Sequence, residues 1–261
     1  MTEPRVTTTG ASDAWADLRL TTQARIGLGR AGNSLPSQRV LEFRAAHAAA
    51  RDAVHDPLDV ESFVATIAGC GLGDPVAVTS KASSRGEYLR RPDLGRVPDD
   101  LSSVPSASAD IGIVLADGLS PRALVDHAEG LVVALKDALS ERFSIAPPVV
   151  ATQARVALGD HIAEALGVQT VIVVIGERPG LSVADSLGIY LTHRARPGCS
   201  DADRNCISNI HSPDGQSYQT AARITASLVD GARRLGRSGV SLKDTSRAEI
   251  TAATAPVIDS A

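Results

Sequence analysis

The chain is 261 residues long, enough for a well-buried core and for two structural units. Hydrophobic residues make up 43% and charged residues 21%, and the formal net charge of -4 excludes a global basic field that would hold nucleic acid or an anionic membrane surface. With 3% aromatic residues, the chain also has little to stack against bases.

Two further features concern the cellular compartment. No apolar run approaches the roughly 18 residues of a membrane span, and the opening stretch MTEPRVTTTGAS lacks the apolar region of a secretion signal. Cys70, Cys199 and Cys206 form no C-x-x-C pair, so we expect free thiols in a reducing compartment. These features predict a cytoplasmic protein without a membrane partner.

The segment RIGLGRAGNS, residues 25–34, contains a possible nucleotide motif. Gly27, Gly29 and Gly32 have the G-x-G-x-x-G spacing of a dinucleotide-binding turn. Such a turn needs a buried strand before it and a helix directly after it. The preceding LTTQAR is polar and mixed, and Pro36 comes before any helical periodicity. These flanks favour a glycine-rich surface loop.

The first part of the chain has mainly helical patterns. After Ser34, apolar residues at spacings of three and four begin with Val40, Phe43 and His47, which predicts a long helix with this stripe buried. A second helix is expected from Asp59 to the glycines at 69–73, and PVAVTS after them predicts a short strand.

A change of pattern near residue 105 predicts a domain boundary. Pro92, Pro98 and Pro105, together with many Ser and Asp residues, interrupt every periodicity there. We therefore expect a mainly helical N-terminal domain over residues 1–105 and an α/β domain over residues 106–261.

The second part alternates strands with helices. Residues 110–118 and 168–176 predict strands, and the second of these, apolar on both faces, is typical of a central strand in a covered parallel sheet. Ser120 followed by Pro121 predicts a helix start between them, and another helix is expected within ALGDHIAEALG. Two more strands, LGIYLTH and NCISNIH, and a closing helix from Ser217 complete the pattern. The predicted fold class is α/β, with a mostly parallel, Rossmann-like sheet covered by helices and a smaller, mainly helical N-terminal part.

Candidate chemistry gathers after the strand at 168–176. Glu177 and Arg178 follow it directly, where ligands bind in open α/β sheets, and Pro179-Gly180 fits the middle of a type II turn. The pair is equally compatible with a ligand contact and with a structural ion pair that holds the turn.

A thiol-imidazole pair in NCISNIH is not expected. Side chains alternate along a strand, so Cys206, Ser208 and Ile210 point to one face while Asn209 and His211 point to the other. The cysteines and histidines also lack the paired short spacings of a zinc site. From the residues alone, a small-molecule enzyme and a cofactor-holding subunit both stay open, and the lack of a nucleophile, base pair or metal set favours the subunit.

Several longer segments resemble one known family. ARIGLGRAGNSLPSQRVLEFRAAHAAARDAVH, ARVALGD, VVIGERPGLSVADSLGIYL and DADRNCISNIHSPDG are similar to the signature segments of the small subunit of ethanolamine ammonia-lyase, in the same order. The resemblance implies an adenosylcobalamin-dependent lyase that converts ethanolamine to acetaldehyde and ammonia by a radical mechanism. It further implies that the large subunit, a TIM barrel, supplies the catalytic residues and that this chain covers the cofactor between the subunits.

The resemblance also implies roles for individual residues. The cofactor-contacting positions of the family correspond to Val156, Glu177 and Cys206, whereas no catalytic and no metal-ligating residue is expected in this chain. The stretch around 197–199 is one residue shorter than in enteric relatives, which alters the loop between two of these positions. Arg25 and Arg30 are expected to contact the large subunit, within a domain that binds it.

Three questions stay open at this level. Some family members carry an amphipathic N-terminal extension that directs them to a bacterial microcompartment, whereas the N-terminal stretch here is short and mostly polar. A stand-alone cobalamin-binding module and a subunit of another B12-dependent dehydratase are the alternatives to the implied lyase. Subunit stoichiometry does not follow from one sequence.

Overall fold

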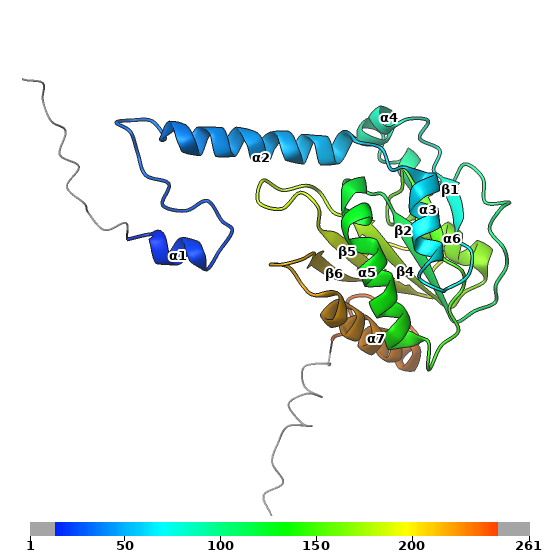
Figure 1. Cartoon of the computed structure of the whole chain (residues 1–261). Helices are drawn as coiled ribbons and strands as arrows, with labels where there is room; N and C mark the ends of the chain where they lie inside the picture. The colour runs from blue at the N-terminus through cyan, green and yellow to red at the C-terminus, as the bar shows by residue number, and fades with distance from the viewer. Residues whose placement is uncertain (1–13, 245–261) are drawn as a thin grey trace, which may run out of the picture. The chain divides into compact units, whose positions relative to one another are not determined.

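The computed structural model describes residues 14–244 and has a mixed α/β architecture (Figure 1). The chain divides between Ala48 and Ala49 into two compact units, and all six strands lie in the second. The elements in chain order are α1 (Ala16–Leu20), α2 (Ser37–His55), α3 (Val60–Ala68), β1 (Val76–Thr79), α4 (Arg85–Arg90), η1 (Leu94–Arg96), β2 (Ile111–Ala116), α5 (Pro121–Leu139), β3 (Val149–Thr152), α6 (Leu158–Leu166), β4 (Thr170–Gly176), β5 (Leu187–His193), η2 (Asp201–Asp203), β6 (Asn205–Ile210) and α7 (Tyr218–Leu235), where η marks a short 3-10 helix.

The sheet is mixed, which corrects the expectation of a mostly parallel, Rossmann-like sheet. Its strand order is β1-β3-β2-β4-β5-β6. The three pairings from β1 to β4 are parallel, whereas β4-β5 and β5-β6 are antiparallel. A parallel return needs a long crossover, usually a helix. Segments 177–186 and 194–204 are short and contain no α-helix, so β5 and β6 run back beside the preceding strand.

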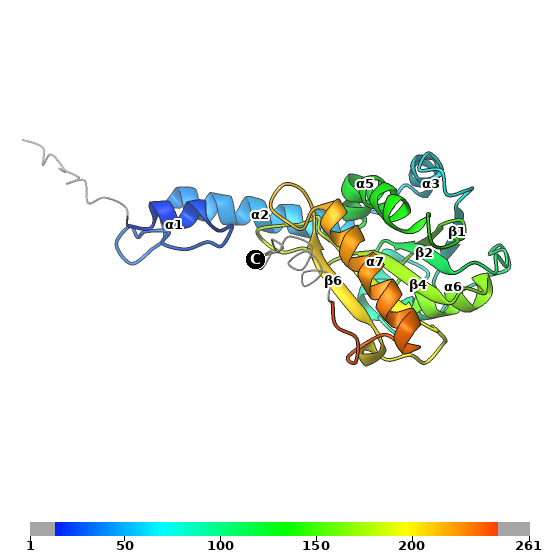
Figure 2. The ribbon, with the colours of Figure 1, turned by 90° about the horizontal axis from the view of Figure 1, so that it is seen from below.

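Helices cover the two faces of the sheet unequally. On one face, α3, α5 and α7 bury the core that includes Ile113, Leu115 and Ile172, and α5 and α7 lie side by side (Figure 2). On the other face, α6 packs over β2 and β4 and buries Val171 and Val173. Because α6 lies over these two strands, the same face of β5 and β6 stays open beside it.

Local sequence signals account for the helix starts. The Ser120 hydroxyl accepts a hydrogen bond from the Ala123 N–H at 3.3 Å, and Pro121 occupies the first helical position of α5, as predicted. Asp59 caps α3 in the same way, with its carboxylate 3.2 Å from the Ser62 nitrogen. Both contacts satisfy backbone N–H groups that the helix itself leaves unpaired.

The structure differs from the predictions for the first part of the chain. The long helix is confirmed as α2, but its only buried residue is Ala53, and Phe43 and His47 are exposed, so the predicted buried stripe is wrong for this chain alone. No strand precedes Gly27 within the described residues, which agrees with a loop there. β1 pairs with β3, and the compact units divide at Ala48, so the predicted boundary at 105 does not coincide with this division.

None of the helices found in residues 14–244 combines the length and the apolar character that crossing a membrane requires.

Candidate functional site

One hollow opens at the carboxyl ends of the parallel strands, where α/β sheets bind ligands, and a second hollow adjoins it over the open face of β5. The 199–204 hollow, of about 420 Å³, lies between the turn that precedes α6 and the segment 199–204. The strand-end hollow, of about 300 Å³, lies between the ends of β2 and β4 at Gly118 and Gly176. Arg155, Val156 and Tyr190 line both hollows, so together they form one surface.

Tyr190 lines both hollows on the open face of the sheet, and Cys206 lies beside it. They are direct partners in the antiparallel pair β5-β6 and share a side-chain hydrogen bond. Burial raises the pKa of Tyr190 to about 12, and the neighbouring Cys206 and Glu177 add to this effect. Both side chains are therefore neutral near neutral pH and suit contact with a large, weakly polar ligand.

The Cys206 thiol is not poised as a nucleophile. Desolvation raises the pKa of the thiol, the hydrogen bond with Tyr190 lowers it, and the Glu177 carboxylate raises it. A nucleophilic cysteine instead needs a lowered pKa from a cation or a helix N-terminus. Cys206 is a free thiol with an exposed side chain.

Glu177 leaves β4 directly and is held by two hydrogen bonds to one carboxylate oxygen. Its Oε2 accepts from the Ser186 hydroxyl at 2.7 Å and from the Asn209 N–H at 3.1 Å. No residue that the structure describes donates a hydrogen bond to Oε1 of Glu177. Within the same residues, Glu177 and Arg178 do not form an ion pair with each other. The carboxylate is thus fixed from behind while one acceptor oxygen stays available in the strand-end hollow.

Val156 belongs to a turn that a buried carboxylate positions. Asp117, at the end of β2, accepts from the N–H groups of Gln153 at 2.9 Å and Ala154 at 3.0 Å, and Arg85 lies 3.3 Å from it. Burial raises the pKa of Asp117, while Arg85 and the backbone donors oppose the increase. These contacts fix the backbone immediately before Val156.

Cys206 of β6 and His211, directly after it, point to different faces, as predicted, but the strand does not alternate regularly. Ile207 and Ile210 pair with Ile189 and Leu187, and all four are buried in the same core, so the prediction that Ile210 shares a face with Cys206 is wrong. A bulge, with Asn209 at φ 60°, adds one residue and resets the alternation.

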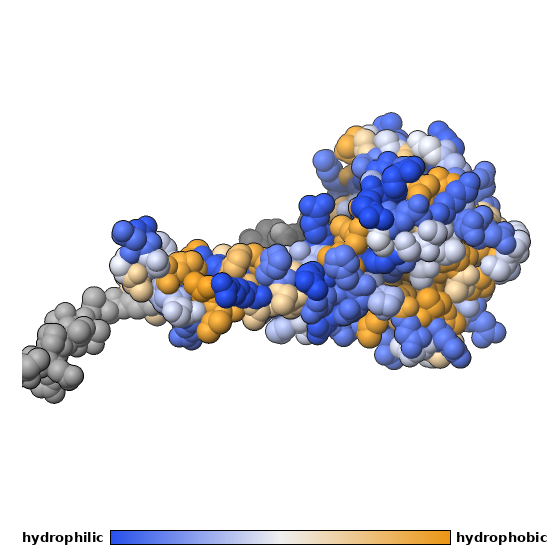
Figure 3. All heavy atoms as spheres, turned by 90° about the horizontal axis from the view of Figure 1, so that it is seen from above, coloured by the Kyte–Doolittle hydropathy of each residue, from blue (hydrophilic) through white to orange (hydrophobic). Residues whose placement is uncertain are grey.

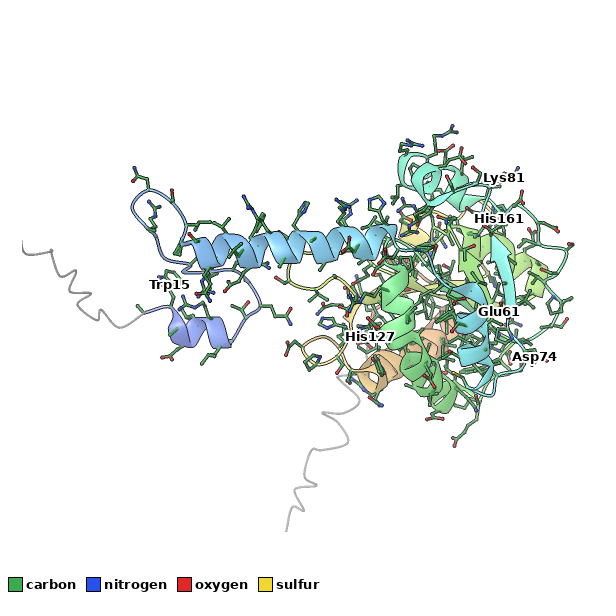
Figure 4. All side chains as sticks on the ribbon, turned by 45° about the horizontal axis from the view of Figure 1, so that its top comes forward. Trp15, Glu61, Asp74, Lys81, His127 and His161 are labelled. Carbon is green, nitrogen blue, oxygen red and sulfur yellow. The ribbon has the colours of Figure 1, made fainter. Side chains whose placement is uncertain are left out.

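His211 lies instead on the face that α5 covers. Its ring centroid is 6.5 Å from that of His127, whose Nδ1 is 2.7 Å from the Tyr218 hydroxyl. His127 and His161 come from helices on opposite faces of the sheet (Figure 4). Within residues 14–244, no three of the histidine, cysteine and acidic side chains gather as metal ligands would.

The structure therefore brings Val156 and Glu177 to one surface, with Cys206 against the Tyr190 that lines it. Sequence reasoning missed Tyr190 and Arg155. Strand alternation could have identified Tyr190, because Leu187, Ile189 and Leu191 fill the opposite face. The chain offers no comparable signal for Arg155, whose position depends on contacts with η1 and α4.

Comparisons with known proteins agree on one family. The model of the family described as ethanolamine ammonia-lyase light chain (EutC) matches residues 12–243. A protein of Rhodococcus erythropolis named ethanolamine ammonia-lyase small subunit is 68% identical over 240 residues, which covers 92% of this chain and 93% of the relative. Proteins with the same name from Xanthomonas campestris pv. campestris (strain B100) and Rhodopseudomonas palustris (strain BisA53) are 49% and 45% identical, each over 91% of this chain and 90% and 92% of the relative.

Proposed function

The chain belongs to the ethanolamine ammonia-lyase light-chain family, and on this premise we propose that it joins a large subunit to convert ethanolamine to acetaldehyde and ammonia. Its own share is to bind adenosylcobalamin on the surface formed by Val156, Glu177 and Cys206, at the contact with the large subunit. The observation that supports this role is the convergence of these three residues, far apart in the chain, around Tyr190.

The chemistry of the surface fits a corrinoid. The rim of a corrin ring carries neutral amide groups whose N–H bonds need acceptors, and the unused Oε1 of Glu177 is such an acceptor. Val156 supplies apolar contact, and the uncharged Cys206 lets a wide macrocycle approach the sheet. When bound, adenosylcobalamin supplies the organic radical that starts the rearrangement, while the protein positions it and excludes water.

The size of the surface explains why a second chain is needed. Enclosed sites for drug-sized ligands measure about 300–1,000 Å³, and the hollows measure about 420 and 300 Å³. Cobalamin is much larger than a drug-sized molecule, so this surface covers one side of it only. The substrate and the other side of the cofactor then belong to the large subunit.

Unit 1, residues 14–48, supplies a candidate contact with the large subunit. Apolar side chains gather on the outside of α1 and α2 (Figure 3), with Leu20 87% and Leu41 64% exposed. Apolar surface of this kind marks protein contacts. We propose that it packs against the large subunit and that Arg25 and Arg30 contribute to the same interface. Unchanged complex formation after charge reversal at both arginines would contradict that assignment.

The decisive experiment is co-expression of the chain with a large subunit from the same genome. Glu177→Gln should weaken adenosylcobalamin binding about tenfold or more, because a hydrogen bond to a charged acceptor contributes about 1.5–3 kcal/mol. Glu61→Gln, on the distant helix α3, serves as a matched control and should leave affinity unchanged (Figure 4). Equal affinity of both variants would contradict the assignment.

Two other outcomes would favour the alternatives. Tight cobalamin binding by the isolated chain would indicate a stand-alone carrier. Turnover of diols without turnover of ethanolamine would indicate a different dehydratase.

A further inference from the structure

Three arginines around the hollows have no carboxylate partner among the residues that the structure describes. Arg96 lines the 199–204 hollow, Arg178 lines the strand-end hollow, and Arg155 lines both. The fourth arginine of this surface, Arg204, is different, because it forms a buried pair with Asp160. Unpaired guanidinium groups at a hollow favour an anionic ligand.

Arg155 is the most strongly positioned of the three. Its backbone N–H donates to the Gly95 carbonyl at 2.8 Å, and its guanidinium carbon lies 4.4 Å from the centroid of the Tyr88 ring. Gly95 makes room for this stacking, because a Cβ there would lie 2.7 Å from Tyr88 and 3.0 Å from Arg155 Cγ. Tyr88 is fully buried, and its hydroxyl donates to the Ala154 carbonyl at 2.9 Å. The stack therefore limits the conformations of Arg155 before any ligand binds.

The same side chain retains unused hydrogen-bonding capacity. Arg155 Nε is buried and has no partner among the described residues. A buried guanidinium nitrogen without an acceptor is costly unless a ligand satisfies it. The backbone hydrogen bond to Gly95 and the stacking on Tyr88 thus hold Arg155 in place, whereas no carboxylate of residues 14–244 forms an ion pair with it.

The start of α6 adds a second, independent attraction for an anion. α6 has nine residues and begins after Ala157, and no side chain caps its first turn. Val156 and Ala157 line the 199–204 hollow, so the positive end of the helix dipole faces the same space as Arg96 and Arg155.

We propose that Arg155, supported by Arg96 and the start of α6, binds the phosphodiester in the nucleotide tail of the cofactor. This inference rests on the proposed function. The corrin amides are neutral and need the acceptor at Glu177, whereas the phosphodiester is the anionic group of the tail and needs donors. The surface accordingly has an acceptor at Glu177 and a second side where Arg155 and Arg96 outnumber the one lining carboxylate, Asp201.

The test compares two corrinoids on the complex with the large subunit. Hydroxocobalamin carries the nucleotide tail, and cobinamide has the same corrin without it. Titration followed by absorbance should show that Arg155→Gln weakens hydroxocobalamin binding about tenfold to hundredfold and leaves cobinamide binding unchanged. Arg155→Lys should recover only part of the loss, because lysine keeps the charge but loses the planar fork.

Controls separate this effect from general damage. Arg234→Gln, on the exposed side of α7, should bind both corrinoids as the parent complex does. The exposed Arg96→Gln should show the same selective loss as Arg155→Gln, to a smaller extent, and keeps the test available if the Arg155 variant does not fold.

The remaining outcomes overturn the inference in distinguishable ways. If Arg155→Gln weakens the binding of both corrinoids equally, Arg155 contacts the corrin ring or stabilises the fold. The proposed function would then stay intact. In another outcome, inorganic phosphate stabilises the parent complex against thermal unfolding but not the Arg155→Gln complex, with no selectivity between the two corrinoids. That result would mean that the site binds free phosphate. Failure of the parent complex to bind either corrinoid would overturn both proposals.

Discussion

Replacing Arg204 with methionine should destabilise the fold by about 3–5 kcal/mol, the usual cost of leaving a buried charge without its partner. The side chains of Arg204 and Asp160 are 2% and 1% exposed. Nη1 of Arg204 lies 2.7 Å from Oδ1 of Asp160, and Nη2 lies 2.7 Å from Oδ2. The same guanidinium donates to the Thr192 hydroxyl at 2.9 Å and to the Cys199 carbonyl at 3.0 Å. The substitution therefore releases α6, β5 and the wall of the 199–204 hollow together.

Urea unfolding of the purified chain, followed by far-ultraviolet circular dichroism, measures this cost. At about 2–4 °C per kcal/mol for a chain of this size, the same loss lowers the melting temperature by roughly 6–20 °C. Arg142→Met is the matched control, since Arg142 is 47% exposed and pairs with Asp230 at the surface. Its cost should stay below about 1 kcal/mol.

A loss below about 1 kcal/mol for Arg204→Met would refute the reasoning, because it would mean that the Asp160 carboxylate tolerates burial alone. The double variant Asp160→Leu with Arg204→Met provides a further check. Since it removes both charges, it should recover a large part of the lost stability.

Three further predictions concern contacts within the second compact unit. Tyr88→Phe should lower stability by about 1–3 kcal/mol, measured by urea unfolding, because it leaves a buried carbonyl without its donor. Gly159→Ala should cost about 1–3 kcal/mol and lower the melting temperature, because the added Cβ would lie 2.4 Å from Val173 Cγ2. Hydrogen bonds from Ser144 hold the pKa of Asp110 below its usual range. This carboxylate therefore stabilises the fold at pH values above its unfolded-state pKa. The stabilisation is lost as the pH falls through the lower folded-state pKa. Asp110→Asn should accordingly be less stable than the parent near neutral pH, and unfolding curves in acid should converge.

The elements that could be predicted from the sequence are those with strong local signals. Ser120 with Pro121 marked the start of α5, and the apolar run before Glu177 marked the central strand β4. β3 was missed although it lies between β1 and β2; its four residues after Pro148 carry a signal comparable to that of β1, which also has four residues after a proline and was predicted. The direction of β5 and β6 depended on the connections, and the apolar pattern of a strand does not carry its direction.

The candidate site, too, could be predicted only where the sequence carries a local signal. The strand-end position indicated Glu177 as a possible ligand contact, whereas the family resemblance supplied the cofactor roles of Val156, Glu177 and Cys206. Because β5 and β6 run antiparallel beside β4, Cys206 pairs with Tyr190, which lines the same hollows as Val156. Arg155 depends on the ring of Tyr88 and the space at Gly95, which are contacts between segments far apart in the chain. Strand alternation predicted the separate faces of Cys206 and His211 but failed for Ile210, because a bulge is not visible in the residue pattern.

The most direct test of the central claim is equilibrium binding of adenosylcobalamin to the co-purified complex of this chain with its large subunit, compared with each chain alone and with the Glu177→Gln complex. We expect tight binding and ethanolamine-dependent acetaldehyde formation only when both chains are present, with weaker binding in the Glu177→Gln complex. Equal binding by the large subunit alone, or by the Glu177→Gln complex, would contradict the claim that this chain covers the cofactor.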